Sequence, residues 1–225
     1  AVYSTAEISV ANATLTANNS EAIVVEGRNS VELTDCAVSG NMTGAYMGDG
    51  SENIHNVMLY QSTSGDAAVG LSSFTMTGGS LTANAGDMFY ITNTEAEITL
   101  TGVSLTNAAD GALLRVEGNS ASRGWGAAGQ NGAQAVFNAN SQLLAGDVIV
   151  DSISTLDFNL SGGSTFNGTI KIVENAQGGT AVDGNANVVI GEGCTWSLTG
   201  DCTVSTLENN GEIIFNGFTI TLADG

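Results

Sequence analysis

The feature that most restricts the fold of this chain is a pattern of alternating apolar and polar residues that returns about every 21–25 residues wherever nothing is inserted. Eight segments open such a unit: EISVA (7–11), VELTD (31–35), FTMTG (74–78), ITLTG (98–102), VFNAN (136–140), LDFNL (156–160), VVIGE (188–192) and IIFNG (213–217). Each unit holds three short alternating runs, as in 74–77, 80–82 and 88–91. Alternation with a period of two predicts half-buried strands, and a fixed short repeat predicts a solenoid.

Three short strands and their corners account for one turn of a solenoid, in which each turn lies about 4.8 Å above the previous one and pairs with it in parallel. We therefore predict an all-β fold: one right-handed parallel β-helix of about eight three-stranded turns, forming a single domain over residues 1–225. The chain begins and ends within the pattern, so we expect it to be a piece of a longer exported protein.

The alternation also predicts which side chains form the core, as three internal columns. The first strands contribute Ile8, Leu33, Met76, Leu100, Phe158, Ile190 and Phe215; the second strands Leu15, Val38, Leu81, Leu105, Leu143, Phe166, Leu198 and Ile220; and the third strands Ile23, Phe89, Leu114, Val148 and Ile172. Asn18, Asn41, Asn84 and Asn107 follow the second strands, where we expect an amide ladder at a corner with left-handed backbone.

Charge and hydropathy restrict the partners. Acids outnumber bases 23 to 4, giving a net charge of −19, and such a surface repels phosphate backbones, which argues against nucleic-acid binding. We expect no cofactor, although a surface this acidic is able to collect Ca²⁺. No apolar run approaches the roughly 18 residues that span a bilayer, so we expect no membrane insertion. Scarce Lys and abundant Asn and Thr favour an extracellular or cell-surface location in a bacterium.

The three cysteines, Cys36, Cys194 and Cys202, are too few for a disulfide scaffold. Cys194 and Cys202 are eight residues apart, so they either close one corner as a disulfide or remain buried free thiols. The only histidine, His55, is distant in sequence and no CxxC motif occurs, which argues against a metal site built on cysteine.

Three insertions interrupt the repeat: 48–71, 119–132 and 176–184. Each is expected to follow the third strand of its turn. Because equivalent positions lie above one another in a solenoid, all three should project from one edge. Loops gathered on a rigid scaffold are where binding residues concentrate.

The outward positions of the third strands hold the candidate site. By alternation, one file contains Val24, Tyr90, Arg115, Ile149 and Lys171, and the next contains Glu26, Thr92, Glu117 and Asp151. Arg123 and Trp125 lie on the adjoining insertion and Tyr60 on the first one. One interpretation is a sugar platform or an anion site. The other is that Arg115 pairs with Glu117 or Asp151 while Trp125 packs its own loop.

Two other features allow a functional and a structural interpretation. His55 is either a general base in the first insertion or a packed, hydrogen-bonded loop residue. The outward positions of the second strands carry pairs of hydroxyl residues that suit an ice-binding face. Thr, however, also has a high intrinsic preference for exposed strand positions. The pairs are Thr14/Thr16, Ser80/Thr82, Ser104/Thr106, Ser197/Thr199 and Thr219/Thr221.

Laid out in turns, the chain resembles the pectin-lyase-like right-handed parallel β-helix superfamily over its whole length. The segments MTGGSLTANAGDMFYITNT, GNSASRGWGAAGQNG and VDSISTLDFNLSGG are similar to secreted β-helix proteins of gut Clostridia and their relatives, which are described as adhesin-like or carbohydrate-binding. Members that cleave pectate use Ca²⁺ held by clustered acids, with Arg or Lys as the base. The resemblance therefore implies Arg115 or Lys171 in that role, near Glu117 and Asp151. The paired Asp residues of polygalacturonase-like members have no counterpart.

We therefore predict an extracellular, non-catalytic, adhesin-like module that binds a polysaccharide or a host or cell surface through a loop-lined edge. The expected binding residues are Tyr60, Tyr90, Arg115, Glu117, Arg123, Trp125 and Lys171. The alternative is a polysaccharide lyase or hydrolase acting on an acidic glycan, with Arg115, Arg123, Lys171, Asp151 and His55 as catalytic candidates. A third possibility is a structural solenoid that assembles end to end, or an ice-binding face of Ser and Thr.

Overall fold

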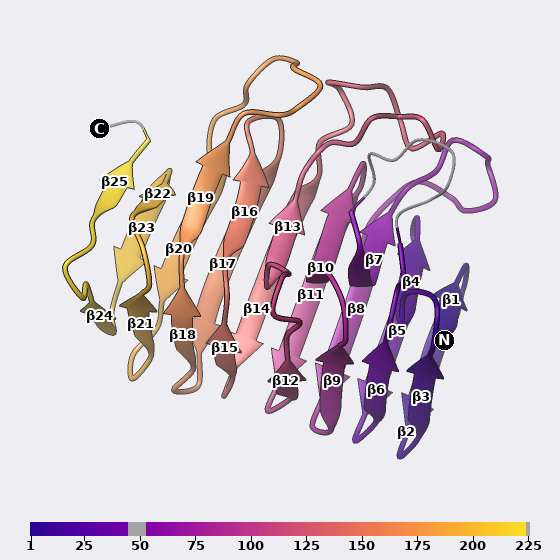
Figure 1. Cartoon of the computed structure of the whole chain (residues 1–225), viewed down its shortest axis with the longest axis horizontal. Helices are drawn as coiled ribbons and strands as arrows, with labels where there is room; N and C mark the ends of the chain where they lie inside the picture. Colours follow the sequence, from indigo (N-terminus) through magenta and orange to yellow (C-terminus); the bar gives the residue numbers. More distant parts are fainter. Residues whose placement is uncertain (45–52, 224–225) are drawn as a thin grey trace.

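The structure is a computed structural model, and it describes residues 1–44 and 53–223. Within these ranges the chain is all-β and contains no helix, so none that could cross a membrane (Figure 1). All strand pairs between described residues are parallel, and neighbours in every sheet are three elements apart in chain order. The chain thus visits each sheet in rotation, which is consistent with a solenoid.

Two long sheets extend along the molecule. Sheet A contains β1 (Val2–Ser4), β4 (Ile23–Glu26), β7 (His55–Tyr60), β10 (Asp87–Thr92), β13 (Leu114–Val116), β16 (Val148–Asp151) and β19 (Ile170–Val173). Sheet B contains β2 (Glu7–Ala11), β5 (Ser30–Thr34), β8 (Ser72–Thr77), β11 (Glu95–Thr101), β14 (Gln134–Asn140), β17 (Thr155–Ser161), β20 (Ala186–Ile190) and β23 (Thr206–Asn209).

The remaining side is divided into shorter sheets. Sheet C contains β3 (Thr14–Ala17), β6 (Ala37–Gly40), β9 (Ser80–Ala83) and β12 (Ser104–Thr106), and sheet D contains β15 (Leu143–Ala145), β18 (Thr165–Gly168), β21 (Thr195–Leu198) and β24 (Glu212–Ile214). Sheet E pairs β22 (Cys202–Val204) with β25 (Ile220–Leu222). Between β12 and β15 the buried Gln142 side chain replaces strand pairing: its Oε1 accepts from Val103 N at 2.5 Å and its Nε2 donates to Val103 O at 3.1 Å.

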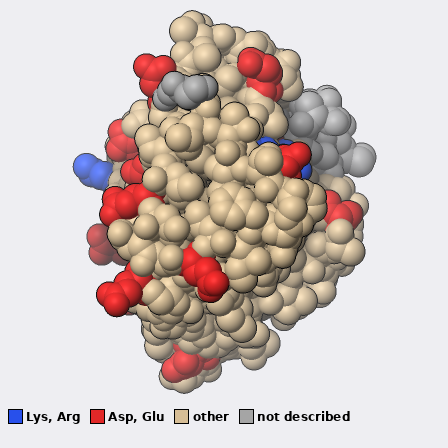
Figure 2. All heavy atoms as spheres, turned by 90° about the vertical axis from the view of Figure 1, so that its left-hand side faces the viewer, with Lys and Arg blue, Asp and Glu red and all other residues tan. Residues whose placement is uncertain are grey.

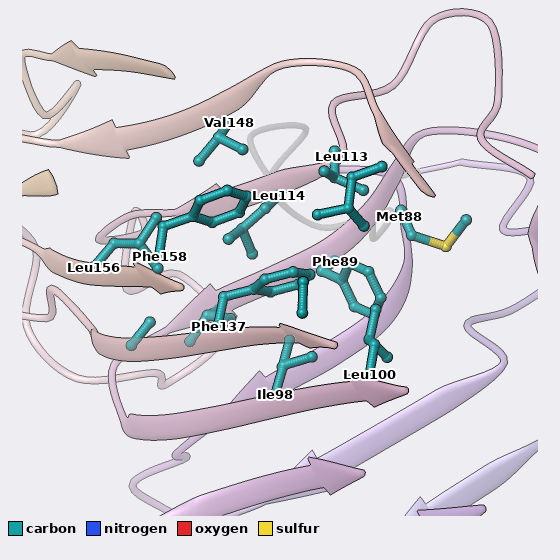
Figure 3. Close-up of a cluster of buried hydrophobic side chains, with 14 of the residues drawn as sticks. Met88, Phe89, Ile98, Leu100, Leu113, Leu114, Phe137, Val148, Leu156 and Phe158 are labelled. Atoms are coloured by element: carbon teal, nitrogen blue, oxygen red, sulfur yellow. The ribbon is translucent and has the colours of Figure 1, made fainter. Parts of the chain in front are cut away.

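The core is one continuous cluster of buried side chains that runs from Ala22 to Val204. Aromatic rings form a ladder along its middle, with neighbouring centroids 5.2–6.3 Å apart in the order Phe74, Phe89, Phe137, Phe158, Phe166 and Trp196. Figure 3 shows Phe89, Phe137 and Phe158 between the strands, surrounded by Leu and Ile side chains. Such rings add about 0.5–1.5 kcal/mol per pair beyond the burial of their area.

The register corrects part of the predicted columns. Sheet B carries two inward columns rather than one, because Ile8 and Phe158 align with Phe74, whereas Leu33 and Leu100 align with Met76. In sheet A, Ile172 aligns with Val150 rather than with Val148, so it also belongs to a second column.

Two predicted core residues, Leu143 and Phe215, are wrong, and a third, Ile220, packs against the core but in another sheet than predicted. Leu143 is 76% exposed and its neighbour Leu144 is buried, because alternation cannot fix the parity of two adjacent leucines. Phe215 is 48% exposed and Ile220 pairs in sheet E, because IIFNG belongs to a second strand: Ile213 pairs with Trp196. The first strand of that last unit is β23, whose sequence TLEN is mostly polar.

The corner prediction is right about the amides and wrong about the backbone of the asparagines. Asn41 Nδ2 donates to Asn18 O at 3.2 Å, and Asn84 Nδ2 donates to Gly40 O at 2.9 Å. None of the four asparagines has a positive φ; at their corner glycines such as Gly86 and Gly146 do. Left-handed residues also recur between the first and second strands of a unit, at Asn12, Asp35, Gly78, Gly102, Ser141 and Gly162.

The described insertions emerge at one edge, beyond the ends of the sheet A strands (Figure 1). The loops 119–132 and 176–184 follow β13 and β19 as predicted, and Gly179 lies too close to Gly129 for a side chain. The first insertion is corrected: it contains β7, so that only 61–71 follows a third strand, and 45–52 lies outside the described residues. All six residues of β7 are buried, which hides its alternation from sequence.

Candidate functional site

The candidate site is the outer face of sheet A. Paired residues on successive strands place one file of side chains along this face: Tyr3, Val24, Met58, Tyr90, Arg115, Ile149 and Lys171. The sequence analysis found this file except for Tyr3 and Met58. Tyr3 occupies the outward position equivalent to Val24 in the preceding unit, so the alternating pattern could have identified it. Met58 lies on β7, the strand that the sequence analysis assigned to an insertion.

Arg115 is held between two carboxylates. Its Nε donates to Asp87 Oδ2 at 2.6 Å, and its Nη1 lies 3.6 Å from Glu117 Oε2. Burial alone would lower the pKa of Arg115, but Asp87 and Glu117 outweigh it and raise that pKa above its usual value. The other oxygen of Asp87 accepts from Ala112 N at 2.7 Å. The guanidinium is therefore fixed as a cation. The structural interpretation predicted the pair with Glu117, but not the closer pair with Asp87, and its alternative partner Asp151 lies elsewhere.

Glu117 lies partly buried beside this pair. Its Oε1 accepts a hydrogen bond from Asn53 Nδ2 at 2.5 Å. Burial raises the pKa of Glu117 above its ordinary value, although Arg115 opposes the shift. Asn53 reaches the site from the segment before β7, and nothing in the sequence pattern indicated this contact.

Asp151 serves the backbone rather than Arg115. It is buried, and its Oδ2 accepts from Gly118 N at 2.8 Å and from Asn175 Nδ2, while its Oδ1 accepts from Ile153 N at 3.3 Å. Gly118 and Asn175 lie next to the loops 119–132 and 176–184, so Asp151 fixes the bases of both. Among the described residues its contacts are those of a structural acceptor.

Lys171 is separated from Arg115 by β16 and has a different partner. Its Nζ lies 3.4 Å from Asp147 Oδ2, and both side chains are more than 40% exposed. The structure therefore does not bring Lys171 together with Glu117 or Asp151 as a catalytic group.

His55 is a packed residue at the start of β7, not a loop residue. Its Nδ1 donates to Asn53 O at 2.6 Å, and its ring lies 5.0 Å from that of Tyr90. Its Nε2 is 3.3 Å from Glu21 Oε1, outside ordinary hydrogen-bond geometry. Burial alone would raise the pKa of Glu21, but the His55 ring, when its Nε2 carries a proton 3.3 Å away, and the hydroxyl of Ser20 lower it to about 2.

The aromatic residues form a small outer core instead of an exposed platform. Tyr60, Tyr90 and Trp125 are 7%, 1% and 5% exposed, and they pack with Val24 and Met58 on the outside of sheet A. The Trp125 ring lies 4.8 Å from Tyr60, and the guanidinium of Arg123 lies 4.3 Å above Trp125. Trp125 therefore packs its loop, as the structural interpretation predicted.

Two buried asparagines hold the loop 119–132 in this position. Asn119 Nδ2 donates to Trp125 O at 3.0 Å and to Thr92 Oγ1 at 2.8 Å, and Asn131 Nδ2 donates to Trp125 O at 2.8 Å. Thr63 N donates to Gly124 O at 2.8 Å, which joins this loop to 61–71. The loop starts at β13 but reaches across to β7.

A shallow groove of about 200 Å³ lies where this loop meets the first strands of sheet A. Val24 and Met58 form its floor, while Tyr3, Glu21, Arg123 and Trp125 are among the residues around it. The Tyr3 hydroxyl donates to the buried carboxylate of Glu26 and lies 2.6 Å from the Tyr60 hydroxyl. Burial raises the pKa of Tyr3, and the hydrogen bond to Glu26 adds to that shift. Glu21 was missed by the sequence analysis, because it lies in a loop without alternation.

Other predicted sites have mixed outcomes. The hydroxyl pairs of β3, β9 and β12 do align on sheet C, with Ala37 and Ser39 between the first two, but Thr219 and Thr221 belong to another side of the molecule. All three cysteines are buried free thiols. Among residues 1–44 and 53–223, no three His, Cys, Asp or Glu side chains converge as a metal site would require.

Fold and site together define an all-β protein of stacked parallel sheets, with ion-paired and aromatic residues covering one outer face. No protein-family model, curated protein or solved structure matches the chain.

Proposed function

We propose that the chain is a non-catalytic, extracellular module that binds a polysaccharide or a host or cell surface through its loop-lined edge. In this proposal the parallel sheets form a right-handed β-helix of about eight turns, related to the pectin-lyase-like superfamily. One observation carries the non-catalytic part: the acid and base candidates on sheet A are engaged with one another or with the backbone. Arg115, Asp151 and Lys171 each have such partners.

The enzyme alternative is less well supported because of what each group would have to do. A lyase base must lose a proton near neutral pH, whereas the two carboxylates beside Arg115 favour its charged form. Glu117, with its pKa raised by burial, is the best general acid on this face. Its neighbours, however, are Arg115 and Asn53, and neither is placed as a free base.

The binding role is supported by the arrangement of the loops. Binding residues concentrate on loops that a rigid scaffold positions, and here the loops 61–71, 119–132 and 176–184 lie together at one edge. Buried amides and Asp151 hold the loops 119–132 and 176–184 in place. A pre-ordered surface of this kind loses little conformational entropy on binding.

A panel of neutral and uronate-containing polysaccharides tests the proposal through two measurements on the intact chain. We expect retention of at least one glycan in affinity electrophoresis, and no release of reducing ends or unsaturated products from any of them. Turnover that the Arg115→Ala variant abolishes would establish the enzyme alternative. Absence of retention on the whole panel, and on cell surfaces, would overturn the binding role.

A second function, end-to-end assembly, is favoured by the C-terminal end of the coil. Ile214, Phe215, Phe218 and Leu222 are 38–48% exposed there. Figure 2 shows this end, where uncharged surface fills most of the centre and acidic side chains lie mainly toward the margins.

The proposed occupant of this end is the N-terminal end of a second copy. β2 and β23 are the two outer strands of sheet B, and Ile8 and Leu207 are the end members of one inward column. The parallel pairing that joins neighbouring units would therefore continue between copies. Repulsion between chains of charge −19 opposes contact, so light scattering should show a mass that grows with salt as well as with protein concentration. At 0.5 M salt the Debye length is roughly 4–5 Å, so repulsion between the chains is largely screened. A mass that stays that of the monomer up to this salt concentration contradicts assembly.

A further inference from the structure

The groove beside Trp125 is a built feature of the fold rather than an accidental hollow. A Gly-rich loop that leaves sheet A at β13 crosses β10 and places Arg123 and Trp125 over β7. Asn119 and Asn131 are 4% and 1% exposed, and their side-chain amides donate hydrogen bonds to Trp125 O that hold the loop in this position. The loop thereby gives the groove a wall that the strands alone do not provide.

The lining of the groove combines an apolar floor with hydrogen-bonding groups at its margin. Val24 and Met58 supply the floor, and the Tyr3 ring, 56% exposed, stands beside it. Glu21 is an acceptor, Arg123 is a donor, and the Tyr3 hydroxyl is held in one position by Glu26. More of the accessible lining is polar than apolar, so the groove suits a ligand that is rich in hydrogen-bonding groups.

The size and charge of the groove indicate the class of ligand. Its volume of about 200 Å³ is below the roughly 300–1,000 Å³ of pockets for drug-sized molecules, so it suits a single small ring. Its margin carries one carboxylate, Glu21, and two cationic groups, the Arg123 guanidinium and the Ala1 ammonium group, while the chain carries −19 overall. The net charge of the whole chain disfavours an anionic ligand, whereas hydroxyl groups find both donors and acceptors in the groove.

We propose that this groove binds one neutral pyranose unit of a glycan, with Glu21, Arg123 and the Tyr3 hydroxyl bonded to ring hydroxyls and the C–H face of the sugar on the floor of Val24 and Met58. The inference rests on the proposed binding function and names its site and ligand class. It differs from the expectation of an acidic glycan ligand.

Calorimetric titration of the intact chain with neutral disaccharides (cellobiose, lactose, maltose) and with digalacturonate tests the ligand class. We expect at least one neutral sugar to bind and digalacturonate to bind more weakly or not at all. Stronger binding of digalacturonate would overturn the class. Absence of binding by every sugar, including longer oligosaccharides, would overturn both the groove site and the carbohydrate part of the proposed function.

Three variants test the site against matched controls. Arg123→Ala, Glu21→Gln and Tyr3→Phe should each weaken binding by about tenfold, because each removes hydrogen bonds to the ligand, two of them with a charged partner. Arg28→Ala, at an exposed arginine outside the groove, should leave the affinity unchanged. Tyr3→Phe keeps the ring, so it remains informative if Arg123→Ala loosens the loop. Unchanged affinity in all three would overturn the groove as the site while leaving carbohydrate binding by the chain intact.

Discussion

Asp151 allows a sharp distinction between a structural and a catalytic carboxylate, through the substitution Asp151→Asn. The amide keeps the shape of the side chain but replaces one acceptor oxygen by a donor. The carboxylate now accepts three N–H groups, from Gly118, Asn175 and Ile153. After the change at least one of them faces an NH₂ group, and the other bonds lose their charge assistance.

The cost can be worked from these contacts. Hydrogen bonds to charged groups contribute about 1.5–3 kcal/mol each, and a buried unpaired donor costs about 1–3 kcal/mol. One bond lost and two weakened at a site 1% exposed should therefore lower the free energy of unfolding by about 2–4 kcal/mol. The matched control is Asp147→Asn, which removes the same charge from an exposed pair with Lys171, where about 0–1 kcal/mol is expected.

Urea unfolding followed by circular dichroism measures both variants, and hydrogen exchange locates the effect. Amide protection should fall in 117–133 and 174–185 in Asp151→Asn and remain unchanged in Asp147→Asn. If the two variants are equally stable to within about 0.5 kcal/mol, Asp151 does not fix the loops and the reasoning fails.

Three further predictions concern other parts of the molecule. Gln142→Leu should destabilise the chain by about 2–4 kcal/mol, because it leaves two Val103 backbone groups unpaired; a neutral effect in urea would show that the backbone there finds other partners. The pKa of Glu21 is lowered to about 2 from an ordinary value of 4.5, so its contribution to stability is complete above pH 4.5 and is lost as the pH falls toward 2. Glu21→Gln should therefore flatten the stability profile in that window, and an unchanged slope contradicts the shift. A thiol reagent should label all three cysteines only after unfolding, and labelling of the native chain would refute their burial.

The sequence was sufficient to predict the all-β fold because its strands alternate on a pleated surface with one buried face. Where a strand is buried on both faces, as in β7, the pattern disappears and the strand was assigned to an insertion. Where two adjacent residues are both apolar, as at Leu143 and Leu144, alternation does not show which of them points inward, and the wrong one was chosen. Both errors arise from contacts that alternation alone does not record.

The candidate site was predictable only in part, for a similar reason. Parity aligned Tyr90, Arg115 and Lys171 correctly, because these residues lie on regular strands. The partners that decide their roles come from elsewhere: Asp87 from a strand end, and Asn53 and Glu21 from loops. The burial of Trp125 depends on a loop folding back across the sheet, which local pattern does not reveal.

The ring ladder from Phe74 to Trp196 has a consequence for how the chain comes apart. Stacked repeats ordinarily depend only on their nearest neighbours, so that a terminal repeat can detach while the others persist. Here five consecutive ring contacts pass through the interior from sheet to sheet. Fraying from either terminus should therefore stop where the ladder begins, and the segment between should melt as one cooperative block.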